Sequence, residues 1–269
     1  MRIAALLLPE MVAAFLALTP RADAQTAARP APTAEDWAAV AKLPDLTGVW
    51  ETPLGGGRNA AGRGGAPAGR AGRGTPAAPS LTPAYAAKAK ALASATRAED
   101  NETANCLPPG LPGIMTQPYP YEILVTPGRV TIISEAYTQV RHIYTDGRPL
   151  PQDPDPTFYG VSVGRWEDNS LVVETVGLAD VPRGLSFPYS EKMKIAERFR
   201  LTDPDTLTLE TTIIDPEALA TPFVMPVRTF VRHRNWTLAE YVCEENNRNF
   251  VDEKGKAGLR LANPNASPR

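Results

Sequence analysis

Short runs rich in β-branched and aromatic residues follow one another along most of this chain, and they constrain its fold more than any other feature. Turn signals stand at joints between the runs, at Pro127-Gly128, Asp168-Asn169, Asp203-Pro204-Asp205 and Asn235-Trp236. Because no helical stretch separates most of the runs, neighbours are expected to pair as hairpins. The runs cover residues 46–52, 121–127, 129–136, 139–145, 159–166, 170–176, 194–201, 206–214, 227–233 and 238–244.

A succession of about ten short strands predicts an all-β fold. Closing the sheet removes its two exposed edges, so a barrel is favoured over an open sandwich. We therefore expect an antiparallel meander closed into a barrel of about 8–10 strands. This barrel domain should span residues 46–250 and be followed by a flexible tail over residues 251–269.

The first residues, 1–24, have the three parts of a secretory signal peptide. Arg2 supplies the basic start, residues 11–18 form an apolar run, and Ala22-Asp23-Ala24 matches a small-residue cleavage site. The apolar run is far shorter than the roughly 20 residues of a transmembrane helix, and no later stretch is long enough. The sequence predicts cleavage after Ala24 and a periplasmic or secreted protein without a transmembrane segment.

Cys106 and Cys243 are the two cysteines of the chain. In an oxidising compartment, two cysteines far apart in sequence most simply form one disulfide, and we predict that pairing. A catalytic thiol is a weaker interpretation, because neither cysteine has a neighbouring histidine to act as its base. A metal site is also disfavoured, since His142 and His233 show no close ligand spacing.

Residues 54–79 differ from the rest in composition, being a low-complexity run of Gly, Ala, Arg and Pro. With almost no side chain to bury, this insert is predicted to be disordered. Its arginines are typical of some RNA-binding segments, but no aromatic residues interleave them and the net charge of the chain is -2. We therefore expect no nucleic-acid partner.

Two helices are expected outside the strands. The N-terminal segment, residues 25–45, contains a short helix from Thr33 to Ala41 with Trp37 as its docking side chain. Thr82 and Pro83 form a cap and first-turn pair that opens an alanine-rich surface helix over residues 82–98.

Several stretches resemble known proteins. Leu46-Thr47-Gly48-Val49-Trp50 is similar to the G-x-W start of lipocalin and wider calycin barrels, in which the tryptophan closes one end beneath an arginine. A family of exported bacterial hypothetical proteins carries stretches that resemble CLPPG (106–110), YTDGRP (144–149), GRWED (164–168), LVVET (171–175) and EYVCEEN (240–246). The resemblance covers most of residues 45–250. It implies a lipocalin-like barrel in an exported protein and carries no reaction with it.

Strand parity identifies carboxylates that point into the barrel, because alternate residues of a strand face opposite sides. Glu197 shares the apolar face of its strand with Ile195, and Glu240 is expected to point inward in the same way. A buried carboxyl group without a cationic partner has a raised pKa, which suits a general acid or base. The alternative is a structural ion pair with Arg228 or Arg141.

The strand QVRHIYT and the turn after it hold the densest group of side chains suited to catalysis. Parity places His142, Tyr144 and Asp146 on one face, and Arg141 and Ile143 on the other. If the first set faces inward, the cavity gains an imidazole, a phenol and a carboxylate for acid/base chemistry. If the second set faces inward, His142 lies in solvent. The catalytic candidates are His142, Tyr144, Asp146 and Glu197.

Aromatic side chains lie mainly in or beside the long connections, where they either dock loops or frame the entrance of a cavity. The proline-spaced residues 151–156 are a candidate lid at that entrance. The ligand-binding candidates are Tyr121, Arg148, Phe158, Tyr159, Trp166 and Glu240.

Three functions compete. The sequence has no nucleotide-binding glycine loop, no G-x-S-x-G and no H-E-x-x-H, so neither a cofactor nor a metal is expected. The favoured hypothesis is a periplasmic barrel that takes an apolar or aromatic small molecule into its cavity. The second adds cofactor-free acid/base chemistry of lyase or isomerase type, and the third is a non-catalytic structural or interaction protein with a packed barrel. The sequence carries no signal for the oligomeric state.

Overall fold

The computed structural model describes residues 31–53, 78–95, 106–179, 185, 187–243, 249–251 and 257–259. The expected signal peptide and nearly all of the low-complexity insert lie outside these residues. Among the described helices, none combines the length and the apolar composition that crossing a bilayer demands.

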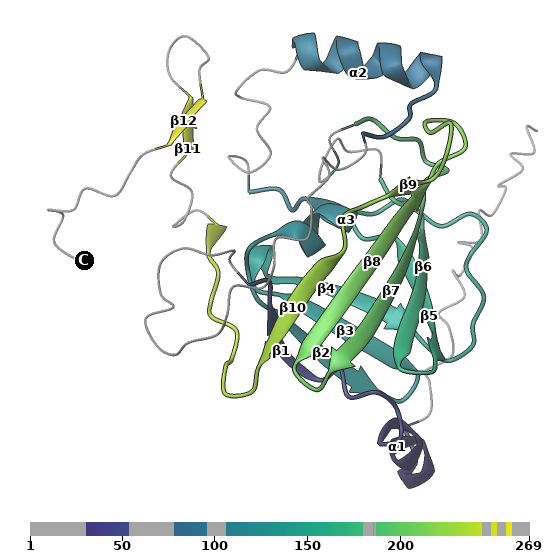
Figure 1. Cartoon of the computed structure of the whole chain (residues 1–269), viewed down its shortest axis with the longest axis vertical. Helices are drawn as coiled ribbons and strands as arrows, with labels where there is room; N and C mark the ends of the chain where they lie inside the picture. The colour runs from purple at the N-terminus through teal and green to yellow at the C-terminus, as the bar shows by residue number, and fades with distance from the viewer. Residues whose placement is uncertain are drawn as a thin grey trace, which may run out of the picture. The chain divides into compact units, whose positions relative to one another are not determined.

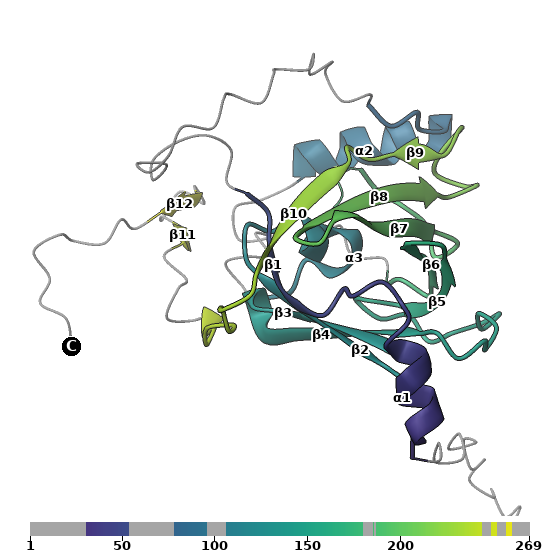
Figure 2. The same ribbon diagram turned by 60° about the horizontal axis from the view of Figure 1, so that its bottom comes forward.

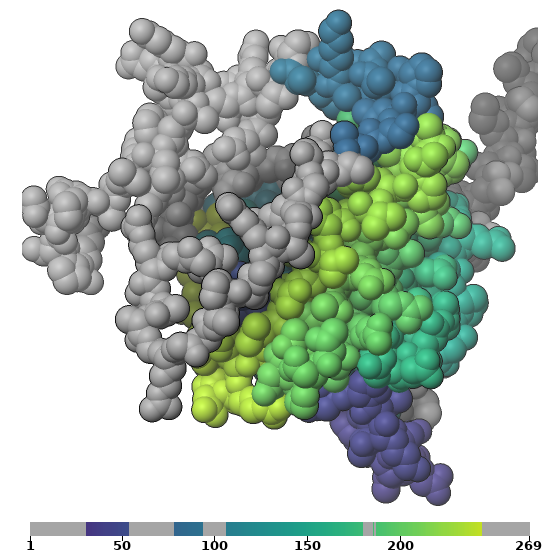
Figure 3. Space-filling view, viewed as in Figure 1, coloured from purple at the N-terminus to yellow at the C-terminus, as the bar shows by residue number. Residues whose placement is uncertain are grey.

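Most of the described chain forms one sheet that closes on itself (Figure 1). Its strands are β1 (Gly48–Glu51), β2 (Tyr121–Thr126), β3 (Arg129–Ser134), β4 (Gln139–Tyr144), β5 (Val161–Glu167), β6 (Ser170–Val176), β7 (Lys194–Asp203), β8 (Thr206–Ile214), β9 (Phe223–Val224) and β10 (Arg228–His233). The order is β10-β1-β2-β3-β4-β5-β6-β7-β8-β9, and a further pairing of β10 with β8 closes a ring of nine strands. The predicted lipocalin-like barrel is confirmed, and the outer faces of β7, β8 and β10 form one continuous surface (Figure 3).

One neighbouring pair departs from the antiparallel meander that the sequence predicted. β4 and β5 run parallel, with Ile143 opposite Ser162 and Tyr144 opposite Val163. A tight turn joins only antiparallel strands, so the chain between Tyr144 and Val161 has to travel back to the end where β4 began. The proline-spaced residues 151–156 belong to this long return connection, and β9 continues along β8 beyond the part that β10 covers.

The last predicted strand, residues 238–244, is not a strand, because residues 238–242 have no regular structure and residue 244 lies outside the described residues. β10 already closes the ring on β1, with His233 opposite Val49, so the barrel leaves no edge for a further strand there. Further along, β11 (Asn249–Val251) pairs with β12 (Ala257–Leu259) as a separate two-stranded sheet, and β12 falls within the segment expected to be a flexible tail.

Both expected helices are present. α1 covers Ala34–Val40, but it buries no residue and Trp37 is 49% exposed, so the expectation that Trp37 docks the helix is wrong. α2 covers Pro83–Ala95, and Thr82 fixes its start: the hydroxyl donates to the carbonyl of Glu217 at 2.7 Å. The backbone N–H of Thr82 donates to the carbonyl of Ala218.

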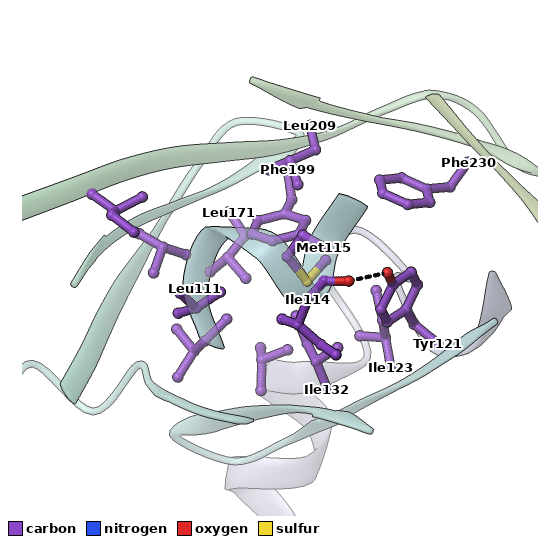
Figure 4. Packing of buried hydrophobic residues seen from close by; sticks show 14 of the residues in the cluster. Leu111, Ile114, Met115, Tyr121, Ile123, Ile132, Leu171, Phe199, Leu209 and Phe230 are labelled. Atoms are coloured by element: carbon purple, nitrogen blue, oxygen red, sulfur yellow. Dashed lines mark hydrogen bonds between the residues drawn. The ribbon is translucent and has the colours of Figure 1, made fainter. Parts of the chain in front are cut away.

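A short segment outside all of the predicted strands and helices fills the middle of the barrel. It comprises α3 (Gly110–Gly113) and the 3-10 turn η2 (Ile114–Thr116), and we call residues 110–116 the plug. Its residues from Gly110 to Met115 are all buried, and the strands encircle it in Figure 2. In Figure 4 the side chains of the plug lie between Phe199 on one wall and Ile132 on the other.

The barrel interior is an apolar cluster built from the inward faces of the strands and from the plug. Trp50 is fully buried, its indole Nε1 donates to the carbonyl of Leu46 at 2.8 Å, and the guanidinium of Arg232 lies 4.5 Å from its ring centroid. A tryptophan beneath an arginine is what the lipocalin resemblance implies. Because side chains of the protein occupy this interior, the barrel holds its own chain where a lipocalin would hold a ligand.

Candidate functional site

Burial along β4 decides which face of this strand lines the barrel. Arg141 and Ile143 are 3% and 0% exposed, whereas Val140 is 47% exposed and His142 is exposed. Arg141 and Ile143 therefore point inward. This is the second of the two alternatives that the sequence left open, and it places His142 on the outer surface of the barrel.

The surroundings of His142 are those of a surface side chain. Its Nδ1 lies 3.3 Å from the hydroxyl of Thr131 on the neighbouring strand β3. Partial burial and, secondarily, the positive charge of Arg129 hold the pKa of His142 below its ordinary value. The imidazole is therefore neutral at neutral pH.

Tyr144 and Asp146 also lie on the outside, where Arg148 joins them. The guanidinium of Arg148 lies 3.8 Å from the centroid of the Tyr144 ring and forms a 2.7 Å ion pair with the carboxylate of Asp146. The backbone N–H of Arg148 also donates to Asp146 Oδ1, as expected for an aspartate that organises a turn. These contacts stabilise the end of β4.

Glu197 points into the barrel, as parity predicted, and it lies far from solvent with a side chain that is 0% exposed. Both carboxylate oxygens accept hydrogen bonds from the guanidinium of Arg141. Arg141 Nε and Nη2 also donate to Ser162 Oγ, and Nη2 donates to Thr175 Oγ1. Of the two sequence alternatives for Glu197, the structure has the ion pair, with Arg141 as its partner.

The four catalytic candidates are therefore not gathered in one place, because Glu197 is inside the barrel and the other three are outside. The ligand-binding candidates are also dispersed. Glu240 was expected to point inward, but it is exposed because its segment is not a strand. Trp166 packs against the core from β5, and the carbonyl of Phe158 accepts a hydrogen bond from the plug residue Leu111.

Two of the ligand-binding candidates, Tyr121 and Tyr159, do lie together. β2 and β4 are both antiparallel to β3 and β5 is parallel to β4, so β2, β4 and β5 all begin at one end of the barrel. Tyrosines stand at each of these starts or just before them. We call the group at this end the tyrosine cluster; it consists of Tyr119, Tyr121, Tyr137, Tyr159 and Tyr241.

Ring contacts and hydroxyl contacts connect the tyrosine cluster. The Tyr241 ring packs edge-on against Tyr119 with centroids 5.5 Å apart and lies 5.4 Å from Tyr137, in the turn η3 (Ala136–Thr138). The Tyr121 hydroxyl donates to the carbonyl of Ile114 in the plug. Tyr159 lies within electrostatic range of Tyr121 and Tyr137.

Three tyrosines of the cluster, Tyr121, Tyr159 and Tyr241, have raised pKa values and stay protonated at physiological pH. Burial raises the pKa of Tyr159 and of Tyr121 well above the ordinary value of a phenol, and burial followed by the neighbouring Tyr137 and Tyr119 raises the pKa of Tyr241 to about 12. Neutral phenols are hydrogen-bond donors and acceptors with apolar faces. The cluster is therefore suited to recognition of a molecule through stacking and hydrogen bonding.

Two buried hydroxyls of this end, Tyr159 Oη and Ser134 Oγ, have no hydrogen-bond partner within the part of the chain that the structure describes. Ser134 is 3% exposed and lies on β3 directly between Tyr121 and Gln139 on the adjacent strands. Buried polar groups are hydrogen-bonded in the great majority of cases, so exceptions require an explanation. Five buried side-chain atoms among the described residues are such exceptions, and the two hydroxyls among them belong to the tyrosine cluster or to the residue opposite Tyr121 on β3.

The backbone is strained at the same end. Tyr137 and Thr138 have φ values of 60° and 49°, and Cys106 has a φ of 54°. A non-glycine residue in this left-handed region costs roughly 1–2 kcal/mol, and such residues concentrate at functional sites. Tyr137 presents its ring to Tyr241 from this conformation.

Residues 238–243 bring Tyr241 against Tyr119 and Tyr137 of the cluster, and we call this segment the strap. The backbone N–H of Ala239 donates to Glu135 Oε2 at 2.8 Å, and the hydroxyl of Thr138 donates to the carbonyl of Tyr241 at 3.4 Å. The strap ends at Cys243, which forms a disulfide with Cys106. This confirms the disulfide predicted from the sequence.

Sequence reasoning named Tyr121 and Tyr159 but missed Tyr137, Tyr241 and Ser134. Tyr137 falls in the short connection between two predicted strands, where its left-handed backbone has no clear sequence signature. Tyr241 lies two positions before Cys243. The predicted disulfide was therefore the available signal that Tyr241 is held against another part of the fold.

Comparisons with known proteins give no family for this chain: no protein-family model matches it, and no curated protein matches it significantly in sequence. Among the described residues, no group of three or more His, Cys, Asp or Glu side chains is arranged to hold a metal ion.

Proposed function

We propose that this protein binds a small aromatic or apolar molecule that carries a hydrogen-bonding group, and that it does so at the tyrosine cluster. The observation that carries the proposal is the pair of buried, unpartnered hydroxyls, Tyr159 Oη and Ser134 Oγ, beside that cluster. The hydrogen-bonding group of a ligand would provide the partner that such a hydroxyl lacks, and the surrounding phenol rings would stack on the apolar body of the ligand.

The tyrosine cluster supports binding better than acid/base catalysis. A general base near neutral pH needs a pKa close to the working pH, and the pKa of the buried phenols is displaced upward, away from it. Glu197 is occupied on both oxygens by Arg141. The proposal therefore assigns recognition to this site and leaves out the lyase or isomerase chemistry that the sequence had raised.

The proposal also places the protein outside the cytoplasm, in the periplasm or beyond the cell. The disulfide between Cys106 and Cys243 supports this, because such bonds persist in oxidising compartments. The resemblance of several stretches to exported bacterial proteins supports the same assignment.

Three monocyclic probes of similar size test the proposed binding: phenol, acetophenone and toluene. Phenol and acetophenone carry a hydrogen-bonding group, and toluene does not. Saturation-transfer NMR and calorimetry should detect tighter binding of the first two. Tyr159→Phe should weaken binding of phenol and acetophenone by about 2–10-fold, the equivalent of one net hydrogen bond, while binding of toluene stays the same.

Tyr144→Phe is the matched control, since it removes a tyrosine hydroxyl from the outer surface of the same barrel. It should leave the binding of all three probes unchanged. Equal effects of Tyr144→Phe and Tyr159→Phe, or no binding of any probe to the wild-type protein, would contradict the proposal.

A second candidate function follows from the plug. Residues 110–115 are buried inside the barrel, which favours a packed barrel that serves as a structural or interaction protein. This candidate predicts that none of the aromatic probes perturbs Tyr159 or Ser134, and it is tested by the same titrations.

A further inference from the structure

We propose that the Cys106–Cys243 disulfide controls access to the tyrosine cluster: the oxidised bond holds the strap closed, and reduction of the bond by a dithiol lets the strap open. The inference rests on the proposed function in that the cluster is taken to be the binding site. It adds that the redox state of one covalent bond regulates that site.

The two ends of the disulfide are held very differently. Cys106 lies four positions before Gly110, where the plug enters the barrel interior. A Cβ on Gly110 would lie 2.7 Å from the carbonyl oxygen of Phe158, and the N–H of Leu111 donates to that same oxygen at 2.9 Å. The chain beyond Cys106 is therefore anchored in the core.

The strap end is held less firmly. Ala239 and Glu240 are exposed, and the hydrogen bonds that Ala239 and Tyr241 make with Glu135 and Thr138 are at exposed positions. A hydrogen bond of this kind contributes about 0.5–1.5 kcal/mol net, so each bond opens readily. The ring contacts of Tyr241 with Tyr119 and Tyr137 are likewise noncovalent, so the disulfide is the covalent cross-link that determines whether the strap stays in place.

The closed arrangement leaves polar groups unsatisfied at this end of the barrel. Tyr159 Oη and Ser134 Oγ lack partners within the described residues, and Tyr137 and Thr138, which contact Tyr241, have left-handed backbone conformations. Both features destabilise the closed arrangement relative to one in which water or a ligand reaches the hydroxyls. Opening is thus favoured locally once the covalent restraint is removed.

A thiol reagent can reach the bond, since Cys106 and Cys243 are both only partly buried. In the exchange, one thiolate of the dithiol attacks a sulfur of the disulfide and forms a mixed disulfide. The second thiolate then displaces the remaining protein sulfur. The protein gains two thiols, and the dithiol becomes a disulfide, so electrons and protons balance.

Hydrogen exchange followed by mass spectrometry tests the inference on the full chain without any ligand. The protein is compared in its oxidised form and after reduction with dithiothreitol. Amide exchange in the strap should accelerate by at least about tenfold on reduction, because local opening then controls it. Amides of β6, β7 and β8 serve as the internal control and should keep their protection.

Two variants sharpen the comparison. The double variant Cys106→Ser/Cys243→Ser should reproduce the reduced form. Glu135→Ala removes a bond to the strap but leaves the disulfide intact, so the oxidised form should change little and the reduced form should open further. Glu174→Ala, an exposed carboxylate on β6, is the matched control for a lost surface charge.

The outcomes are separable. Equal strap exchange in oxidised and reduced protein overturns the inference. Loss of protection in β6, β7 and β8 on reduction also overturns it, because the bond then maintains the whole fold. The phenol titration is repeated on both forms: faster association with the reduced form supports the inference, whereas an open strap with no phenol binding to either form removes the proposed function and leaves the control of the strap standing.

Discussion

Arg141 and Glu197 form an ion pair in the interior of the barrel, and each member compensates the charge of the other. Their side chains are 3% and 0% exposed, so removal of one partner leaves an unpaired charge in the low-dielectric interior of the protein. Ser162 and Thr175 accept hydrogen bonds from the same guanidinium, and they complete the set of partners.

Glu197→Gln should lower the free energy of unfolding by about 3–5 kcal/mol, the usual effect of breaking a buried pair on one side. The double variant Arg141→Met/Glu197→Leu should lower the free energy of unfolding by clearly less than the sum of the losses caused by Arg141→Met alone and Glu197→Leu alone. Urea denaturation measures both. Glu167, a surface carboxylate that bridges Arg165 and Arg198, is the control, and Glu167→Gln should change stability far less than Glu197→Gln does. Additive effects at Arg141 and Glu197 would show that the pair is uncoupled.

Ser134 and Tyr159 lead to the opposite expectation. A buried hydroxyl without a partner destabilises the folded state by about 1–3 kcal/mol, so Ser134→Ala and Tyr159→Phe should each keep or raise the free energy of unfolding in the absence of ligand. Thermal denaturation detects this gain. A loss of stability in both variants would mean that the two hydroxyls are hydrogen-bonded in solution.

Among the elements, the plug depends on one glycine. Gly110 has a φ of 62°, and a Cβ there would lie 2.7 Å from the Phe158 carbonyl oxygen. Gly110→Ala therefore combines left-handed strain with a clash against backbone, and it should destabilise the protein by more than about 2 kcal/mol.

Gly147 provides the matched control for the plug. It also has a positive φ, of 81°, but nothing lies within 4 Å of a Cβ at this position. Gly147→Ala should therefore show backbone strain alone, of about 1–2 kcal/mol. The difference between the two variants in chemical denaturation isolates the contact of the plug with the barrel wall; equal losses would contradict that contact.

The strands were predictable, whereas the elements that fill and cover the barrel were not. In β7 the alternation of Ile195, Glu197 and Phe199 with charged residues gave both the strand and its inward face. The plug has no such period: CLPPGLPGIM is irregular by composition, and only the surrounding barrel makes its burial favourable. The strand predicted over residues 238–244 was wrong for the opposite reason. LAEYVCE has the alternation of a strand, but the closed barrel offers no edge with which it could pair.

The candidate site was less predictable than the strands, because its residues come together through contacts between distant parts of the chain. Parity gave two consistent assignments for His142, and the choice depended on Ile143 packing into the core. The tyrosine cluster assembles residues from positions 119 to 241, through strand direction and a disulfide. Neither the packing of Ile143 nor the assembly of the tyrosine cluster follows from a local pattern of residues.

At the scale of the whole molecule, closure of the barrel joins distant parts of the chain. β1 pairs with β10, which places Val49 opposite His233, and β10 also pairs with β8. Domains dominated by such long-range strand pairing fold in about milliseconds to seconds. Stopped-flow refolding of the oxidised protein should fall in this range, and a dominant microsecond phase that recovers the full signal would contradict this expectation.

The parallel pair of β4 and β5 is linked to the number of strands in the closed ring. In a closed ring whose neighbours all run in opposite directions, up and down strands alternate, so the number of strands must be even. A ring of nine requires an odd number of parallel neighbours, and here β4 and β5 supply one. A parallel pair is therefore a topological necessity of an odd barrel, and here the return connection between β4 and β5 provides it. A hairpin in its place would reverse β5, and the same nine strands could then close only with a parallel pair elsewhere in the ring.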